Sequence, residues 1–272
     1  MKNNLNKRYF LISFLITFCL VTLFSFISLV SPDKQTLTPA PDTPKTYTPT
    51  KTHDMTVLLI GEGESKNYAL LKASAEQNTL YLMSLPNQMK INDKTLSQTQ
   101  EYLGAGYLKT TLNEHFGIEI DNFIRISEKT FVKVLDTLGA MPLKTRDDIF
   151  SYEHSFSLSK GEHILPFEKV IGVMKHNTEQ GENYRLNEQT KILCEIVNKK
   201  INLEKIPIPQ EFFNMAINLV DTDITAFDFD LRRDFITAFL ENPKAVPLEM
   251  EFSQDYTLSD ATQTLIKTHF GT

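Results

Sequence analysis

Apolar residues recur along this chain in two kinds of cluster, and the first kind is typical of strands. Short runs of mostly apolar residues, bounded by polar residues, glycine or proline, indicate strands buried in a sheet. Strands are predicted over residues 55–60, 69–75, 79–85, 123–126 and 141–143. Only Glu76, Gln77 and Asn78 separate the second of these from the third, so we expect the two strands to form a hairpin.

In the second kind of cluster, apolar residues repeat every three or four positions, which indicates amphipathic helices. Helices are predicted over residues 107–116, 128–138, 210–219, 232–240 and 260–270. Ser127 and Ser259 are suited to cap two of these helices, and Gly117 and Gly139 are suited to end two of them. Residues 92–101 are polar and are predicted to be a loop. Strands and helices do not alternate strictly, so the expected fold is mixed α/β (α+β), with helices flanking a central mixed β-sheet.

Residues 161–201 are predicted to form a short helix, a polar loop and a longer helix. The first helix is expected to begin near Pro166, which has no backbone donor to lose in a first turn. The apolar stripes of the two helices would pack together and hold the intervening loop, HNTEQGENYR, at the rim of the domain. Loops held by a rigid frame often carry binding and catalytic residues, so this segment is a candidate site.

Residues 9–30 form a continuous stretch without a charged residue, which is long enough to cross a bilayer as one transmembrane helix. Lys2, Lys7 and Arg8 precede it, and basic flanks mark the cytoplasmic side of a membrane. The expected organisation is a cytoplasmic N-terminus at residues 1–8, a transmembrane signal anchor at 9–30, an extended Pro/Thr-rich linker at 31–53 and an extracellular domain at 54–272. A cleaved signal peptide is the alternative, although its apolar region is typically only about 7–15 residues long.

Charge is distributed unevenly along the chain. The net charge is −6, but residues 1–53 contain six Lys and Arg against two acids. The rest holds 22 basic against 32 acidic side chains, a net charge of −10. An acidic domain repels polyanions at long range, which argues against a nucleic-acid partner. Cys19 and Cys194 do not suggest a disulfide framework, and Cys194 is interpreted as a small core residue.

The order of segments is more specific than any short motif, since the sequence contains no Walker loop, G-x-G-x-x-G, G-x-S-x-G or H-E-x-x-H. After the apolar stretch and linker come VLLIG, a hairpin ending in SLP, GAGYLKTTLNEHFGIEIDNFIRISEKTFVKVLDTLGAMPL and LSKGEHILPFEKVIGVMKHNTEQGENYRLNEQ. In this order the chain resembles the LytR-CpsA-Psr family of bacterial cell-envelope proteins, also called the cell envelope-related transcriptional attenuator domain. The resemblance covers residues 55–201.

The resemblance implies a function at the cell membrane. Members of the family are membrane-anchored, face outside, and transfer anionic glycopolymers from a polyprenyl-pyrophosphate carrier to peptidoglycan or a related acceptor. The lipid lies in a hydrophobic groove, acidic residues hold Mg²⁺, and arginines clamp the pyrophosphate. The implied partners are therefore a polyprenyl-phosphate-linked glycan, peptidoglycan and the membrane, and the implied cofactor is Mg²⁺. Cations suit this chemistry because they stabilise charge on the phosphoryl oxygens.

The charged positions of the family map onto this chain with many substitutions. Arg185 and Gln189 match the family motif, and Lys175 and Glu182 differ from it but keep the sign of the charge. The resemblance implies Arg185, Lys175 and Glu182 as catalytic residues, and Gln189, Lys66, Asn87 and Gln88 as substrate-binding residues. Asn87 and Gln88 stand where the family has Arg-Asp. Their side chains can still form hydrogen bonds at these positions, but they carry no charge.

Other family positions depart further. Gly63 stands where the family has an aspartate after VLLIG, and Asn177 replaces a family arginine. Glu188 places a negative charge where the family has an arginine beside the phosphate, which repels the expected substrate. Glu62 and Glu64 together with Glu182 could hold a metal ion in a shifted arrangement, and the metal ligands are left unassigned.

Three hypotheses follow from these observations. The chain is an active glycopolymer phosphotransferase, a relative with weak or lost catalysis that acts as a tethered lipid-, glycan- or protein-binding scaffold, or an unrelated tethered binding domain. The substitutions favour the second. An apolar groove beside Arg185 and Lys175 would support lipid binding, whereas a filled core would favour the third hypothesis. The structural alternative for Arg185 is a salt bridge with Glu182 or Glu188 on the same helix.

Overall fold

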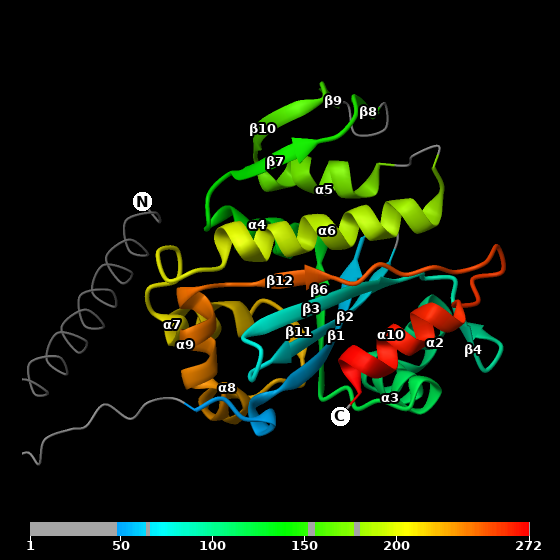
Figure 1. The fold of residues 1–272 in the computed structure, drawn as a ribbon, viewed down its shortest axis with the longest axis horizontal. Helices are drawn as coiled ribbons and strands as arrows, with labels where there is room; N and C mark the ends of the chain where they lie inside the picture. The colour runs from blue at the N-terminus through cyan, green and yellow to red at the C-terminus, as the bar shows by residue number, and fades with distance from the viewer. Residues whose placement is uncertain (1–47, 64–65, 152–155, 177–179, 272) are drawn as a thin grey trace, which may run out of the picture. The chain divides into compact units, whose positions relative to one another are not determined.

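A six-stranded mixed sheet lies at the centre of the computed structural model, which describes residues 48–63, 66–151, 156–176 and 180–271 (Figure 1). In spatial order its strands are β11 (Asp221–Thr222), β6 (Asn122–Ser127), β1 (Met55–Glu62), β2 (Asn67–Ser74), β3 (Thr79–Leu85) and β12 (Ala245–Pro247). β1, β2 and β3 pair antiparallel, whereas β6 pairs parallel with β1 and β12 parallel with β3. The predicted central mixed sheet flanked by helices is therefore confirmed.

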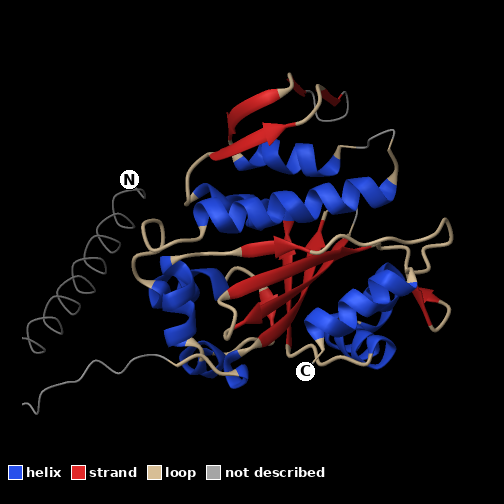
Figure 2. Cartoon of the chain, viewed as in Figure 1, coloured by secondary structure: helices blue, strands red, loops and turns tan. Residues whose placement is uncertain are grey.

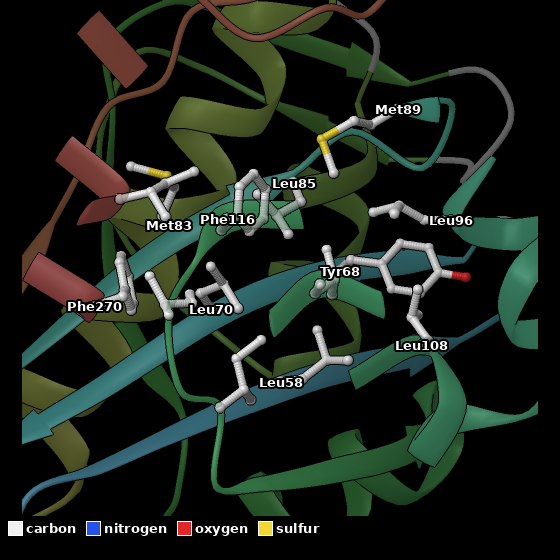
Figure 3. Packing of buried hydrophobic residues seen from close by; sticks show 14 of the residues in the cluster. Leu58, Tyr68, Leu70, Met83, Leu85, Met89, Leu96, Leu108, Phe116 and Phe270 are labelled. Carbon is white, nitrogen blue, oxygen red and sulfur yellow. The ribbon is translucent and has the colours of Figure 1, made fainter. Parts of the chain in front are cut away.

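One face of the sheet is closed by a dense apolar core. The helices on this face are α2 (Leu96–Leu103), α3 (Ala105–Phe116) and α10 (Asp260–Phe270). Leu58, Leu70 and Met83 point from three neighbouring strands into this core, where Phe270 of α10 is also fully buried (Figure 3). Alternation along the strands sends every second residue to this face, and the residues between them go to the other.

The opposite face carries most of the remaining helices (Figure 2). They are α4 (Glu128–Asp136), α5 (Phe167–Lys175), α6 (Glu182–Lys200), α7 (Pro209–Ile217) and α9 (Arg233–Glu241), with the short α8 (Ala226–Leu231) beside them. α6 packs directly on β3 and β12, where Cys194 is buried against Leu82 and Ala245. Cys194 is therefore part of the core, as expected. Its burial raises the pKa of the thiol to about 12.

Small structures surround these layers. Three two-stranded sheets are formed by β4 (Lys90–Ile91) with β5 (Lys94–Thr95), β7 (Met141–Thr145) with β10 (Gly161–Leu165), and β8 (Ile149–Ser151) with β9 (Phe156–Leu158), and a 3₁₀ turn, η1 (Lys51–His53), precedes β1. The β7–β10 pair lies over α5 (Figure 1). Among the described residues no helix is long and apolar enough to cross a bilayer. The predicted anchor at 9–30 lies outside them.

Most predicted helix boundaries agree with the structure. The Ser127 and Ser259 hydroxyls accept hydrogen bonds from the backbone N–H groups of Thr130 and Thr262, so both predicted caps are confirmed. α3 ends at Gly117, whose φ of 64° lies in the left-handed region that glycine adopts easily.

One prediction of secondary structure was wrong. Residues 92–101 are not a loop, because α2 begins at Leu96 behind a capping box formed by Thr95 and Gln98. The two helices predicted within residues 161–201 are confirmed, since Pro166 is the N-cap of α5 and α6 covers Glu182–Lys200. Ahead of them, Gly161–Leu165 is strand β10, which was not predicted. Pairing with β7 provides the hydrogen bonds that define this strand.

A buried hydroxyl pair joins α6 to the sheet. Thr190 of α6 donates to the carbonyl of Leu186 and accepts hydrogen bonds from the Ser84 backbone N–H at 3.2 Å and the Ser84 hydroxyl at 2.7 Å. Ser84 lies in β3 beyond the last residue paired with β12. Thr190 therefore takes the place of a strand partner and fixes the position of α6.

We expect Thr190→Val to lower the free energy of unfolding by about 1–3 kcal/mol, because both Ser84 donors lose their acceptor. The measurement is urea denaturation followed by circular dichroism. Thr264→Val is the matched control, since Thr264 makes the same bond to the fourth preceding carbonyl at an exposed position of α10. The control should change stability by less than about 0.5 kcal/mol. Equal effects in both variants would contradict the role given to Thr190.

Candidate functional site

An almost entirely apolar groove of about 390 Å³ lies between the second face of the sheet and helices α4 to α7. Its walls include Leu59 and Ala69 from the sheet, Ile124 and Ile126 from β6, Phe131 and Val134 from α4, Met174 from α5, Leu193 from α6, and Phe213 and Ile217 from α7. α7 contains no buried residue, although its sequence PQEFFNMAI is strongly apolar. This part of the core is open, and the apolar side chains face a space instead of each other.

The charged residues of the groove lie at the ends of the elements that form it. Glu62 ends β1, Glu128 opens α4, and Lys175 closes α5. Lys175 is the sole cationic residue among the described residues that line the groove. With Glu62 and Glu128 beside it, this lining has a formal net charge of −1.

Lys175 is paired with a carboxylate inside the groove. Its Nζ lies 2.5 Å from Oε2 of Glu128, and the two side chains are 18% and 38% exposed. Each charge is also favoured by its own helix, because an acid suits the first turn of α4 and a base suits the last turn of α5. The pair therefore joins two helix ends and at the same time neutralises the lysine.

Glu62 is held by hydrogen bonding on the other wall of the groove. Its Oε1 accepts from Nε2 of Gln100 at 3.0 Å and lies 3.7 Å from NH1 of Arg125. Arg125 is itself shared with Asp221 at 2.7 Å. The neighbouring Tyr68 is buried, and burial raises the pKa of its hydroxyl to about 12, so this hydroxyl stays protonated.

Gln189 lies in the wall between this groove and a second cleft. It is 8% exposed, and its Oε1 has no hydrogen-bond partner among the described residues. A buried acceptor without a donor costs about 1–3 kcal/mol, so such atoms are rare in protein cores. The unpaired oxygen of Gln189 therefore lowers the stability of the fold. The residue lies at the boundary between the groove and a second cleft.

The second cleft lies on the other side of α6 and has a volume of about 770 Å³. It is lined by α6, by β7 with the residues after it, by the end of α5 and by β12. Arg146 reaches Glu188 across it at 3.6 Å, and Lys191 binds Glu188 at 3.0 Å and Glu249 at 2.8 Å. Burial lowers the pKa of Lys191, but these two carboxylates outweigh it and raise the pKa overall.

Arg185 belongs to the second cleft and not to the lining of the apolar groove. Its guanidinium donates to both carboxylate oxygens of Glu182, at 2.7 Å from Nε and 2.5 Å from NH2. The predicted structural salt bridge with Glu182 is therefore present, and the alternative partner Glu188 instead binds Arg146 and Lys191. The structure places Lys175 in the groove, Arg185 in the cleft and Gln189 in both.

The other predicted substrate-binding residues are held by contacts outside the two linings. Lys66 is 3.9 Å from the carboxylate of Glu101 on α2. Asn87 and Gln88 follow β3 in a turn closed by the hydrogen bond from the Met89 N–H to the Pro86 carbonyl. Within the described residues none of these three lines the groove or the cleft.

The carboxylates do not gather into a metal site in the part of the chain that the structure describes. No three Asp, Glu, His or Cys side chains converge there. Glu62 and Glu182 of the proposed shifted arrangement are bound to Gln100 and Arg185 respectively, and Glu64 lies outside the described residues. Since Mg²⁺ prefers several oxygen ligands in octahedral geometry, the described carboxylates, paired as they are, do not fit the ion.

Glu128 was missed by sequence reasoning. It lies in a predicted helix directly after its cap, where an acid has an ordinary structural explanation. Its partner Lys175 is far away in the sequence, so their pairing depends on how α4 packs on α5. A glutamate on the apolar side of a helix beside Phe131 and Leu135 was the available signal.

The chain is similar to known proteins in sequence and in fold. The teichoic acid transferase TagU of Bacillus subtilis (strain 168), named as a polyisoprenyl-teichoic acid–peptidoglycan transferase, is 24% identical over 184 residues, covering 64% of this chain and 59% of that relative. The chain thus spans less than two thirds of its length. A solved structure from Eubacterium siraeum DSM 15702 superposes with a TM-score of 0.73 at 20% identity, covering 86% of this chain and 97% of that one.

A second solved structure, TagV of Bacillus subtilis, has a TM-score of 0.63 at 15% identity and covers 80% of this chain and 97% of its own. At such identities the likeness shows the fold alone. The family model, described as the LytR_cpsA_psr family, matches residues 36–249. This range includes the open groove, its polar end and most of both layers of helices. The chain therefore belongs to the LytR-CpsA-Psr family.

Proposed function

We propose that this chain is a membrane-anchored protein of the cell envelope that binds a polyprenyl-phosphate-linked glycan, with weak or lost transfer to peptidoglycan. The anchor is the apolar segment at residues 9–30, which would place the N-terminus in the cytoplasm and the domain outside. The observation that carries the proposal is the open apolar groove, whose one described lysine is already paired.

The groove suits a long apolar ligand. Half-buried apolar side chains from β6, α4 and α7 face a common space, and each would lose contact with water when a lipid tail enters. Burial of apolar area is worth about 25 cal/mol per Å², so a tail of several isoprene units gains substantial binding energy. Ligand pockets of roughly 300–1,000 Å³ include the volume observed here.

The polar end of the groove suits transfer poorly. A phosphate group beside Lys175 has to compete with the carboxylate of Glu128 and is repelled by Glu62. Arg185, the retained family arginine, is occupied by Glu182 in the neighbouring cleft. Removing a single donor that stabilises developing charge typically costs about 10²–10³ in rate, so the loss of several makes turnover very slow.

An active transferase is the competing function. It is supported by the names of the TagU relatives, which are teichoic acid transferases of Bacillus species. It requires Arg185 and Lys175 to leave their carboxylate partners when substrate binds. Binding and turnover assays separate the two functions.

Filling the groove should weaken lipid binding. Ala216 of α7 lines the groove, and Ala216→Phe adds a ring into the open space. We expect photolabelling by a photoreactive polyprenyl phosphate to fall about tenfold, since overpacking costs ~1–3 kcal/mol. The control is Met215→Phe on the same helix, because Met215 is exposed and does not line the groove. Equal labelling of both full-length variants, purified in mild detergent, would refute the groove as the tail site.

Removing the carboxylate partner of Lys175 should strengthen binding of the phosphate. We expect Glu128→Gln to tighten binding of the same polyprenyl phosphate by roughly two- to tenfold, because the freed ammonium no longer has a competing anion. Glu182→Gln is the matched control, since it frees Arg185, which does not line the groove. If only the control tightened binding, the head group would belong beside Arg185.

Transfer is measured with the full-length protein, a polyprenyl-pyrophosphate glycan, peptidoglycan and Mg²⁺. We expect product formation no faster than that of Arg185→Ala, because the charges that stabilise the transferred phosphoryl group are paired. Product formed by the unaltered chain and lost in Arg185→Ala would establish an active enzyme. Labelling of the groove in the same preparation checks that the protein is competent to bind lipid.

A further inference from the structure

We propose that the domain itself contacts the surface of the lipid bilayer through an apolar patch on α7 and α8. This α7–α8 patch is formed by Ile208, Met215, Phe227 and Leu231, which are 51%, 37%, 73% and 45% exposed. They are four of the nine large apolar side chains exposed within the described residues, so apolar exposure is concentrated on these two helices. The inference rests on the proposed anchor at residues 9–30 and adds a second membrane contact to it.

The two helices of the patch are joined by an aromatic stack. The rings of Phe213 on α7 and Phe229 on α8 lie with their centroids 4.6 Å apart. Phe229 is buried, whereas Phe227 and Leu231, four residues apart on α8, are exposed. Single exposed apolar side chains are common on protein surfaces, but a group of them on neighbouring elements marks an interaction surface.

A hydrogen bond connects the patch to the point where the chain enters the domain. NH2 of Arg232, directly after α8, donates to the carbonyl oxygen of Asp54 at 3.2 Å. Asp54 follows η1, and the predicted linker leads from there back to the predicted anchor. An extended linker over residues 31–47 would reach at most about 50 Å. α8 is therefore on the side of the domain at which the proposed tether to the membrane begins.

The tether makes a small patch sufficient for binding. Burying one large apolar side chain is worth about 1.5–3 kcal/mol, so Phe227 and Leu231 alone would bind a bilayer weakly. An anchor in the same chain makes the contact intramolecular, with a high effective concentration of membrane at the patch. Two weak signals together give stable membrane attachment where one does not.

The charges around the patch do not oppose an anionic membrane surface. Residues 54–272 carry a net charge of −10, but residues 226–233 contain two aspartates and two arginines and are neutral. Asp228 lies 3.6 Å from Arg232, and Asp230 lies 2.5 Å from Arg233. The side chain of Arg233 is 56% exposed, and its guanidinium has further N–H groups that suit lipid phosphates.

Contact through α7 would also bring the tail groove next to the membrane. α7 contains no buried residue, because Phe213 and Ile217 line the groove while Met215 is exposed and does not line it. α7 is thus a wall between the groove and the patch. A lipid that leaves the bilayer at the patch would have to pass only this helix to enter the groove.

The test uses the absence of tryptophan from this chain, which lets one introduced tryptophan report on one position. Full-length Phe227→Trp is reconstituted into vesicles of phosphatidylcholine and phosphatidylglycerol, with or without bromine on the acyl chains. An inserted ring lies about 5–10 Å deep, so we expect brominated lipid to lower its emission by roughly half. Leu231→Trp should be quenched similarly.

Tyr102→Trp is the matched control. Tyr102 is also 73% exposed, but it lies on α2, which covers the other face of the sheet. Its emission should fall by less than about a tenth, because a ring that stays in water does not meet the acyl chains. Thermal unfolding of each variant in mild detergent checks that the fold is retained.

Flotation of the unaltered chain with the vesicles tests the anchor separately. Flotation without quenching of Phe227→Trp and Leu231→Trp, or equal quenching of Tyr102→Trp, overturns the patch contact and leaves the anchor standing. A blue-shifted emission that bromine does not quench overturns it as well, and indicates that protein, such as a second copy of this chain, covers α8. A chain that does not float overturns the anchor and the patch contact together.

Discussion

The sheet has two apolar faces, and the protein closes only one of them completely. α2, α3 and α10 cover the first face with side chains that are fully buried. On the second face, α6 is fixed to β3 by the Ser84–Thr190 hydroxyl pair, while α7 and β6 leave their apolar residues facing a groove. An open core costs stability that close packing would otherwise provide. The cost is understandable if a ligand tail completes the core.

The charged side chains around the groove and the second cleft are arranged as pairs. Lys175 binds Glu128, Arg185 binds Glu182, and Arg146 and Lys191 share Glu188. Each pair links two elements or two turns of one helix, so each has a structural role. On the proposed function, the same pairing leaves none of these four cations free for phosphoryl transfer. The proposal is thus that the fold and the tail site persist while the transfer chemistry weakens.

Local signals in the sequence were sufficient for much of the fold. The caps at Ser127 and Ser259 and the stop at Gly117 depend on neighbouring residues, and all three are observed. β12 and β10 depend on partners distant in the chain, β3 and β7, so their short sequences carry no strand signal. The groove could not be predicted from the spacing of apolar residues. In the sequence, an apolar residue that packs in a core has the same pattern as one that lines an open groove. The Glu128–Lys175 pair could not be predicted either, because it depends on how α4 packs on α5.

The central claim is that the open space between β6, α4 and α7 holds a lipid tail whose phosphate lies beside Lys175. A crystal structure of the full-length protein with a polyprenyl phosphate of medium chain length tests it most directly. The account predicts continuous density for the tail between Ile124, Phe131 and Phe213, with the phosphate within hydrogen-bond distance of the Lys175 ammonium. An empty groove with lipid bound elsewhere, or a groove filled by rearranged side chains, would contradict it.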